Sequence, residues 1–291
     1  MSTFQKATRR GQKARVCFAG PTGSGKTWTA LIFAQVLGDR VAVIDTERQS
    51  ASLYADEFTF DTVALDPPYS PERYIELIGA AETEGYDVIV VDSLSHAWAG
   101  TGGVLEMVDD ISARSRARNS FAAWREATPH QNRLVDRLLQ SSAHVIVTLR
   151  SKMAYAMDID DKGRTQIRKV GLEPVQRQGL EYEFTLIADM DQEHKLVVSK
   201  SRCAPLADLV VQRPGVDLAQ RLKMWLAAGD APYLTKLEIS ELDGRLRSLP
   251  ADLFTQAVTF AKLNLPSLTS GLFTVNNRET LLEFVEAIDV T

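Results

Sequence analysis

Hydrophobic positions along this chain alternate between short apolar runs and longer stretches with helical spacing. The apolar runs, rich in Val and Ile, predict strands at residues 15–20, 40–45, 62–65, 87–93 and 144–150. The stretches between them predict helices at residues 28–38 and 71–85, and a long helical stretch that ends at about residue 142. Strands and helices that alternate in this way form a mostly parallel sheet with helices on both faces. The pattern therefore predicts the α/β fold class.

The pattern changes after residue 150. Between residues 151 and 175, alternating residues flank a turn signal, Asp-Asp-Lys-Gly at residues 160–163, and predict a protruding β-hairpin. Two further runs, at residues 181–190 and 195–202, predict adjacent and antiparallel strands. The last segment of the chain predicts about three short amphipathic helices and holds no chemical motif.

These elements divide the chain into a core and smaller flanking parts. Residues 1–14 carry Lys6, Arg9, Arg10 and Lys13 among small polar residues. Such a segment is typical of a flexible basic arm, or of a solvated tail without a partner. The expected boundaries are residues 1–14 for the arm, 15–229 for the core, 230–236 for a linker and 237–291 for a small helical C-terminal module.

Length and composition limit the class of protein. A chain of 291 residues with 45% hydrophobic and 24% charged residues suits one large soluble domain with a small appendage. No apolar run approaches the ~20 residues that cross a bilayer, so we expect a cytoplasmic protein without membrane contact. Cys17 and Cys203 make neither a disulfide framework nor a zinc site. The net charge of −5 does not by itself indicate nucleic acid, for which local basic clusters are needed.

Residues 20–27 read GPTGSGKT and fit the pattern G-x-x-x-x-G-K-[ST] between a predicted strand and a predicted helix. The glycines of this loop let backbone N–H groups turn inward around a phosphate. Lys26 is placed to reach the β- and γ-phosphates, and the Thr27 hydroxyl to bind Mg²⁺. The pattern predicts a site for a nucleoside triphosphate. Its expected residues are Gly20, Pro21, Thr22, Gly23, Ser24, Gly25, Lys26, Thr27 and Trp28.

Two carboxylates follow predicted strands. Asp92 ends the run VIVVD, where a carboxylate at the C-terminal edge of a parallel strand faces the phosphate site and holds Mg²⁺ through water. Ser93 follows it, so the adjacent Asp–Glu pair usual in AAA+ proteins is absent. Hydrolysis still needs a group that orients the attacking water, and the best candidate is Glu47, just past the second strand. The alternatives are a strand-end cap for Asp92 and a solvated loop charge for Glu47.

Here the chain resembles a known family. AVIDTE at residues 42–47, followed by VIVVDSLS at residues 88–95, is similar to the RecA superfamily over roughly residues 14–228. In that family the catalytic glutamate follows the strand beside the P-loop strand, and the phosphate-binding strand ends in Asp-Ser. The resemblance implies a RecA-like P-loop NTPase core. The roles it implies are phosphate and Mg²⁺ binding by Lys26 and Thr27, water activation by Glu47, and metal support by Asp92.

A basic pair and an arginine extend the resemblance. Lys200 and Arg202 lie two apart in VVSKSRCAP and therefore share one face of a strand. RecA-like ATPases use basic residues at this strand's end as fingers that reach the triphosphate of the neighbouring subunit, in a ring or a filament of identical subunits. The alternative is a pair of edge-strand charges that discourage aggregation. Arg150 falls where RecA-like proteins carry a polar γ-phosphate sensor, usually Gln, and is a candidate sensor.

In RecA-like proteins the loops after the Asp-Ser strand and after the next core strand take single-stranded DNA. Here the first carries arginines near Phe121 and Trp124, and the second is the predicted hairpin. Cations neutralise phosphates and aromatic rings stack on unpaired bases. Acidic neighbours such as Asp109 and Asp158, and a core role for Trp124, are the alternative reading. The candidate DNA-binding residues are Arg114, Arg116, Arg118, Lys152, Lys162, Arg164, Arg168 and Lys169.

The overall pattern resembles phage-encoded, shortened RecA-like ATPases of the single-strand-annealing recombinase group. The hallmarks are the early P-loop, DTE, VVDSLS, the stretch from Gly179 to Phe184, and KSR. The resemblance implies an Mg²⁺-ATP-dependent oligomer that binds single-stranded DNA beside a single-strand DNA-binding protein, in phage recombination or replication in the host cytoplasm. The alternative is a nucleotide-dependent switch or loader without DNA contact. A small-molecule kinase is disfavoured because no arginine-rich lid is visible, and a GTPase because no Asn-Lys-x-Asp motif is present.

Overall fold

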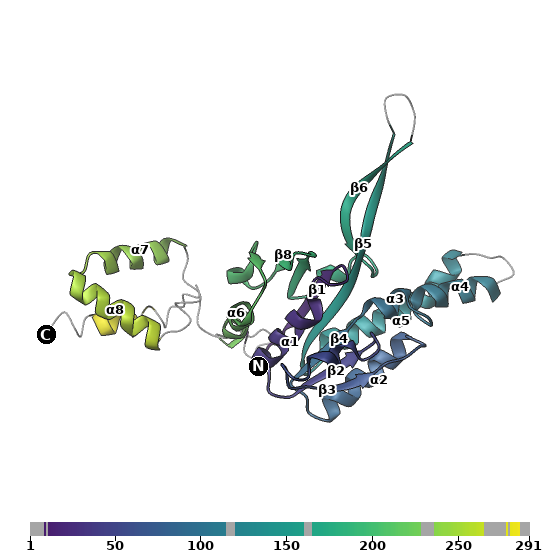
Figure 1. Ribbon diagram of the computed structural model, residues 1–291, viewed down its shortest axis with the longest axis horizontal. Helices are drawn as coiled ribbons and strands as arrows, with labels where there is room; N and C mark the ends of the chain where they lie inside the picture. The colour runs from purple at the N-terminus through teal and green to yellow at the C-terminus, as the bar shows by residue number, and fades with distance from the viewer. Residues whose placement is uncertain are drawn as a thin grey trace, which may run out of the picture. The chain divides into compact units, whose positions relative to one another are not determined.

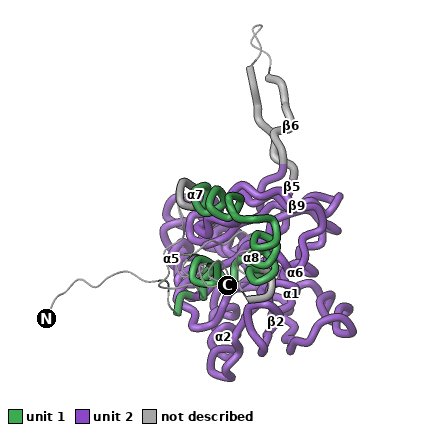
Figure 2. Tube along the Cα trace, turned by 90° about the vertical axis from the view of Figure 1, so that its left-hand side faces the viewer, with its two compact units in different colours: residues 1–12, 220–291 green, residues 13–219 purple. Residues whose placement is uncertain are grey.

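The computed structural model describes residues 9, 11–114, 120–159, 165–227, 236–264, 278 and 280–285. The chain divides into two compact units, coloured separately in Figure 2: residues 13–219, and residues 1–12 together with 220–291. Among the described residues, no helix combines the length and the apolar character needed to cross a lipid bilayer.

A central sheet organises the first unit (Figure 1). Its strands are β1 (Arg15–Gly20), β2 (Val41–Asp45), β3 (Asp61–Ala64), β4 (Val88–Asp92), β5 (His144–Ile159), β6 (Thr165–Pro174), β7 (Leu186–Met190), β8 (Lys195–Ser201) and β9 (Val210–Gln212). They lie in the order β3-β2-β4-β5-β1-β7-β8-β9, with β6 paired to β5. The pairs from β3 to β7 are parallel, whereas β8 and β9 are antiparallel to their neighbours. The predicted mostly parallel sheet is confirmed, and it suits a P-loop NTPase core.

The helices of the described residues are α1 (Lys26–Leu37), α2 (Pro71–Thr83), α3 (Ser95–Ala99), α4 (Val104–Arg114), α5 (Ser120–Gln140), α6 (Val216–Ala227), α7 (Lys236–Arg247) and α8 (Ala251–Asn264). The long helical stretch expected to end at about residue 142 is present but divided, because α3 ends at Ala99 and α4 begins at Val104. Between them, Gly102 has a φ of 75°, which a right-handed helix does not accept. The chain turns there and runs into a second helix.

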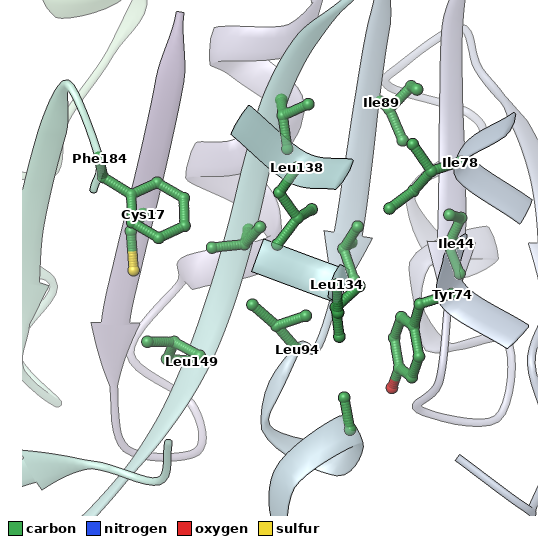
Figure 3. Packing of buried hydrophobic residues seen from close by; sticks show 14 of the residues in the cluster. Cys17, Ile44, Tyr74, Ile78, Ile89, Leu94, Leu134, Leu138, Leu149 and Phe184 are labelled. Atoms are coloured by element: carbon green, nitrogen blue, oxygen red, sulfur yellow. The ribbon is translucent and has the colours of Figure 1, made fainter. Parts of the chain in front are cut away.

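Helices cover both faces of the sheet. On one face, Tyr74 and Ile78 of α2 and Leu134 of α5 pack in a buried cluster with Ile44 and other strand residues (Figure 3). On the other face, Phe18 of β1 meets Phe33 of α1 edge to face, with ring centroids 5.0 Å apart. This burial holds the strands in register, so that the loops after β1, β2, β4 and β5 meet at one edge of the sheet.

Strand β5 belongs to both the central sheet and the hairpin. It is parallel to β4 over His144–Val147 and to β1 over Val145–Arg150, and it is antiparallel to β6 over Ser151–Ile159. The predicted hairpin is therefore confirmed in its backbone pairing, while its turn at residues 160–164 lies outside the described residues. One continuous strand thus joins the sheet to the hairpin.

The described part of the C-terminal segment is helical. Phe260 of α8 stacks on Phe284 with ring centroids 3.9 Å apart, beside buried Ala257, Leu281 and Val285. That residues 237–291 form a module of their own stays a prediction.

Candidate nucleotide-binding site

The P-loop spans the turn from β1 into α1. Gly23 and Gly25 have φ values of 80° and 89°, which side chains with a Cβ rarely adopt. Gly20 is required for a different reason, because a Cβ there would lie 2.4 Å from the Met190 carbonyl oxygen. Backbone conformation therefore favours glycine at residues 23 and 25, and close approach requires it at residue 20.

Two groups of this loop suit a phosphate. The Lys26 side chain is largely buried and its Nζ donates to the Pro21 carbonyl at 2.8 Å. Burial lowers the Lys26 pKa, an effect that the negative charge of Asp92 opposes. Ser24 Oγ is buried and has no hydrogen-bond partner among the described residues. A bound phosphate would give Ser24 Oγ the partner it lacks, because a buried polar atom without one is costly, and it would accept further hydrogen bonds from the Lys26 ammonium.

The Asp92 carboxylate accepts hydrogen bonds from two hydroxyl groups. The Thr27 hydroxyl donates to Asp92 Oδ2 at 2.5 Å, and the Thr148 hydroxyl from β5 donates to Oδ1. Burial raises the Asp92 pKa, and these hydrogen bonds work against that effect. A hydroxyl and a carboxylate beside a phosphate loop form the oxygen-ligand set that Mg²⁺ prefers. Thr27 and Asp92 would therefore hold the metal, which neutralises charge on the phosphates when bound.

Glu47 is positioned by a buried carboxylate. Asp45 at the end of β2 accepts the Glu47 N–H at 2.6 Å and the Ala51 N–H at 2.9 Å, which fixes the loop between them. The Glu47 side chain reaches the same pocket as Lys26 and Asp92. Arg150 Nε donates to Glu47 Oε1 at 2.8 Å, across 103 positions of sequence. The predicted water-activating group and the candidate sensor are thus in direct contact.

A second network links the ends of β2 and β4. Thr46 Oγ1 accepts the Ser93 N–H at 2.8 Å and lies 2.7 Å from His96 Nδ1. The His96 ring stacks on Tyr69 with centroids 4.8 Å apart. Burial, aided by the Arg150 charge, lowers the His96 pKa. His96 was missed in the sequence because a lone histidine in a helix carries no signal.

A cavity of about 700 Å³ contains the P-loop residues from Thr22 to Trp28 together with Glu47, Asp92 and Arg150. Its outer walls were not predicted. One wall includes Tyr54, whose ring packs edge to face on Trp28 with centroids 5.5 Å apart. The remaining wall residues are Thr29, Ile32, Ser50, Leu53, Met190, His194, Arg213, Pro214 and Gly215. They come from α1, from the 3₁₀ helix at Ser50–Tyr54, from β7 and from later loops, and none belongs to a sequence motif, so only the fold reveals them.

Lys200 and Arg202, the residues predicted as fingers, lie outside the nucleotide cavity. Lys200 Nζ and Arg202 Nη2 donate to one backbone acceptor, the Tyr182 carbonyl, at 2.5 and 3.4 Å. Neither side chain lines the nucleotide cavity of its own chain. Lys200 instead lines a larger cavity of about 1180 Å³, which also contains the stacked rings of Trp98 and Trp124. The structure therefore does not bring the finger residues to the P-loop within one subunit.

The candidate DNA-binding residues are only partly described. Arg114 forms an exposed ion pair with Asp110 at 3.6 Å, and Lys152 forms one with Glu173 at 3.1 Å. Trp124 is half-buried and packs against a small core cluster. The backbones of Arg168 and Lys169 lie in β6. The others, Arg116, Arg118, Lys162 and Arg164, lie outside the described residues.

A phosphate loop after the first strand, a threonine hydroxyl bonded to a strand-end aspartate and a mostly parallel sheet are typical of a P-loop nucleoside triphosphatase. The model of a family described as an AAA domain matches residues 12–208. The chain therefore belongs to that family and is an AAA-type P-loop ATPase. No curated protein matches the chain.

Proposed function

We propose that this chain is a RecA-like ATPase that assembles on single-stranded DNA and promotes annealing or strand exchange, in phage recombination or replication. Mg²⁺-ATP binds between subunits of a homo-oligomer. Glu47 of one subunit orients the attacking water, while Lys200 and Arg202 of the next subunit stabilise charge on the transferring phosphoryl group. ATP binding orders the assembly and hydrolysis releases it. A single-strand DNA-binding protein is its expected partner.

The observation that carries this proposal is the path from Glu47 to the hairpin. The Arg150 side chain holds Glu47, its N–H donates to Ser95 Oγ at 2.9 Å, and its carbonyl accepts the Val175 N–H at 2.7 Å. Ser151, the next residue, begins the hairpin ladder opposite Pro174. A ligand on the hairpin is thereby connected to the candidate catalytic group through a single residue. An ATPase stimulated by DNA needs such a connection.

Charge and aromatic groups support a nucleic-acid ligand. Lys152 is 63% exposed at the base of the hairpin, and Arg168 and Lys169 follow on the partner strand. Phe121 is 86% exposed at the start of α5. Cations for phosphates and rings for bases are how proteins hold a single strand without reading its sequence.

The test is ATP hydrolysis with and without single-stranded DNA, at low and moderate salt, with Lys26→Ala as the blank. We expect stimulation by DNA that weakens as salt rises, because counterion release drives phosphate contacts. Lys152→Ala should weaken the apparent DNA affinity and lower the salt slope by about one. Lys223→Ala, at an exposed lysine of α6, is the charge-matched control.

Hydrolysis indifferent to DNA would contradict the proposal. The chain would then act as a nucleotide-dependent switch or loader, with its partner on residues 237–291. Full DNA stimulation in Lys152→Ala would instead move the DNA contact away from the hairpin base.

A further inference from the structure

Two long cationic side chains meet at one carbonyl. Lys200 lies at the end of β8 and Arg202 just after it, and both donate to the oxygen of Tyr182. The β7–β8 ladder shifts register between Ile187 and Ala188, which pairs Lys200 with Ile187. A carbonyl oxygen has two lone pairs and so accepts both donors. The two cations are thereby gathered at one point.

The carbonyl itself is fixed by a short turn, residues 179–184. The 3₁₀ helix η2 (Leu180–Tyr182) begins after Gly179, which has a φ of 96°. The Tyr182 N–H donates to the Gly179 carbonyl at 3.1 Å. Leu180 and Phe184 are buried and anchor both ends of the turn in the core. Tyr182 is 69% exposed, and it contacts the cations through its backbone carbonyl oxygen.

We propose that the turn at residues 179–184 is a positioning element for the finger cations. The Tyr182 carbonyl gathers Lys200 and Arg202 and sets their reach toward the triphosphate of a neighbouring subunit. This inference rests on the proposed function, in which these cations act between subunits. Lysine and arginine side chains have many rotamers, and a shared acceptor restricts them before the transition state forms. Preorganised charge stabilises a transition state more than charge that must first be ordered.

Gly179 offers a clean test, because no heavy atom lies within 4 Å of the place a Cβ would occupy. Substitution therefore acts through the positive φ alone. Asn tolerates this conformation best, Ala less well, and β-branched Val least. We expect kcat for ATP to fall in the order Gly, Asn, Ala, Val, by about tenfold for Gly179→Val, with KM and ATP-analogue binding unchanged.

Gly11 supplies the matched control. It has a φ of 77°, it also has open space around the Cβ position, and it lies in the other compact unit. Gly11→Val likewise puts a β-branched residue at a positive φ, but outside residues 179–184, so its kcat should equal that of the native protein. An equal loss in both Val variants would overturn the inference, because general backbone strain would then explain it.

A double-mutant measurement separates positioning from stability. In a Lys200→Ala/Arg202→Ala background, Gly179→Val should cause no further loss, since it acts only through those cations. A further tenfold loss there, or a flat series at Gly179, would refute the positioning role. If Gly179→Val fails to bind nucleotide, the Asn and Ala variants still decide the order. Native turnover in Lys200→Ala/Arg202→Ala would instead refute the finger function itself.

Discussion

The nucleotide site and the finger face, which is the surface that carries Lys200 and Arg202, hold their charged groups in different ways. At the nucleotide site, Asp92 is held by two hydroxyls and the Glu47 loop by a buried carboxylate. On the finger face, Lys200 and Arg202 share one backbone oxygen. The first region is organised by its own chain. The second presents cations on the surface, where a neighbouring subunit supplies what they act on under the proposed function.

The largest expected effect is in the first region. Lys26→Ala removes the cation that reaches the phosphates, and we expect no measurable hydrolysis. Equilibrium binding of a fluorescent ATP analogue, with Lys223→Ala as control, measures the loss. Tight binding with normal turnover in Lys26→Ala would remove the P-loop from the mechanism.

Glu47→Gln tests the water-activating role. The amide keeps the shape of the side chain but cannot take a proton, so kcat should fall about 10³-fold while ATP still binds. Single-turnover hydrolysis beside an ATP-binding titration separates the two steps. Undiminished turnover would assign Glu47 to holding Arg150 only.

Arg202→Ala tests the finger face. With Lys200 left in place we expect a loss of about 10²-fold in kcat and unchanged nucleotide binding to the isolated subunit. Mixing this variant with Lys26→Ala subunits should restore activity, because each supplies what the other lacks. Mixtures that stay inactive at every ratio argue against action between subunits.

The smallest effect is expected at Glu72, which belongs to neither region. Burial opposes its ionisation, but hydrogen bonds from His130 and Arg133 outweigh burial and lower the Glu72 pKa. A lowered folded-state pKa adds stability above the unfolded value near 4.3, and this stability is lost as pH falls through the folded value. Glu72→Gln should therefore cost about 0.5 kcal/mol at pH 7, since the pair is partly exposed. Urea titrations should show the difference vanish in acid, and a difference that persists there would point to packing.

The P-loop and Asp92, which form the inner half of the nucleotide site, were predictable because short sequence patterns encode them. GPTGSGKT sits between a strand and a helix, and Asp92 ends an apolar run, so short stretches of sequence place both. The parallel sheet follows from the same alternation. The division between α3 and α4 was not predicted, because a single residue, Gly102, decides it.

Glu47 and Arg150 were expected at the site, but their contact and the other contacts of its outer half were not predictable, because they join distant segments. Glu47 and Arg150 are 103 positions apart, and His194 reaches Ser24 across 170. Such pairs depend on strand order, which places β5 and β7 on either side of β1. The role of the Tyr182 carbonyl was likewise not predictable from the sequence, because every residue type has a backbone carbonyl.

Strand β5 also has a mechanical consequence. The nine residues from Ser151 to Ile159 pair with β6, and at about 3.3 Å per residue they reach about 30 Å beyond Arg150. A tilt of about 5° at the base of such a lever displaces its far end by about 2.6 Å. That displacement is comparable to the length of a hydrogen bond. Conversely, a force applied at the far end of the hairpin exerts a large torque at its base, where the Arg150 side chain donates to Glu47.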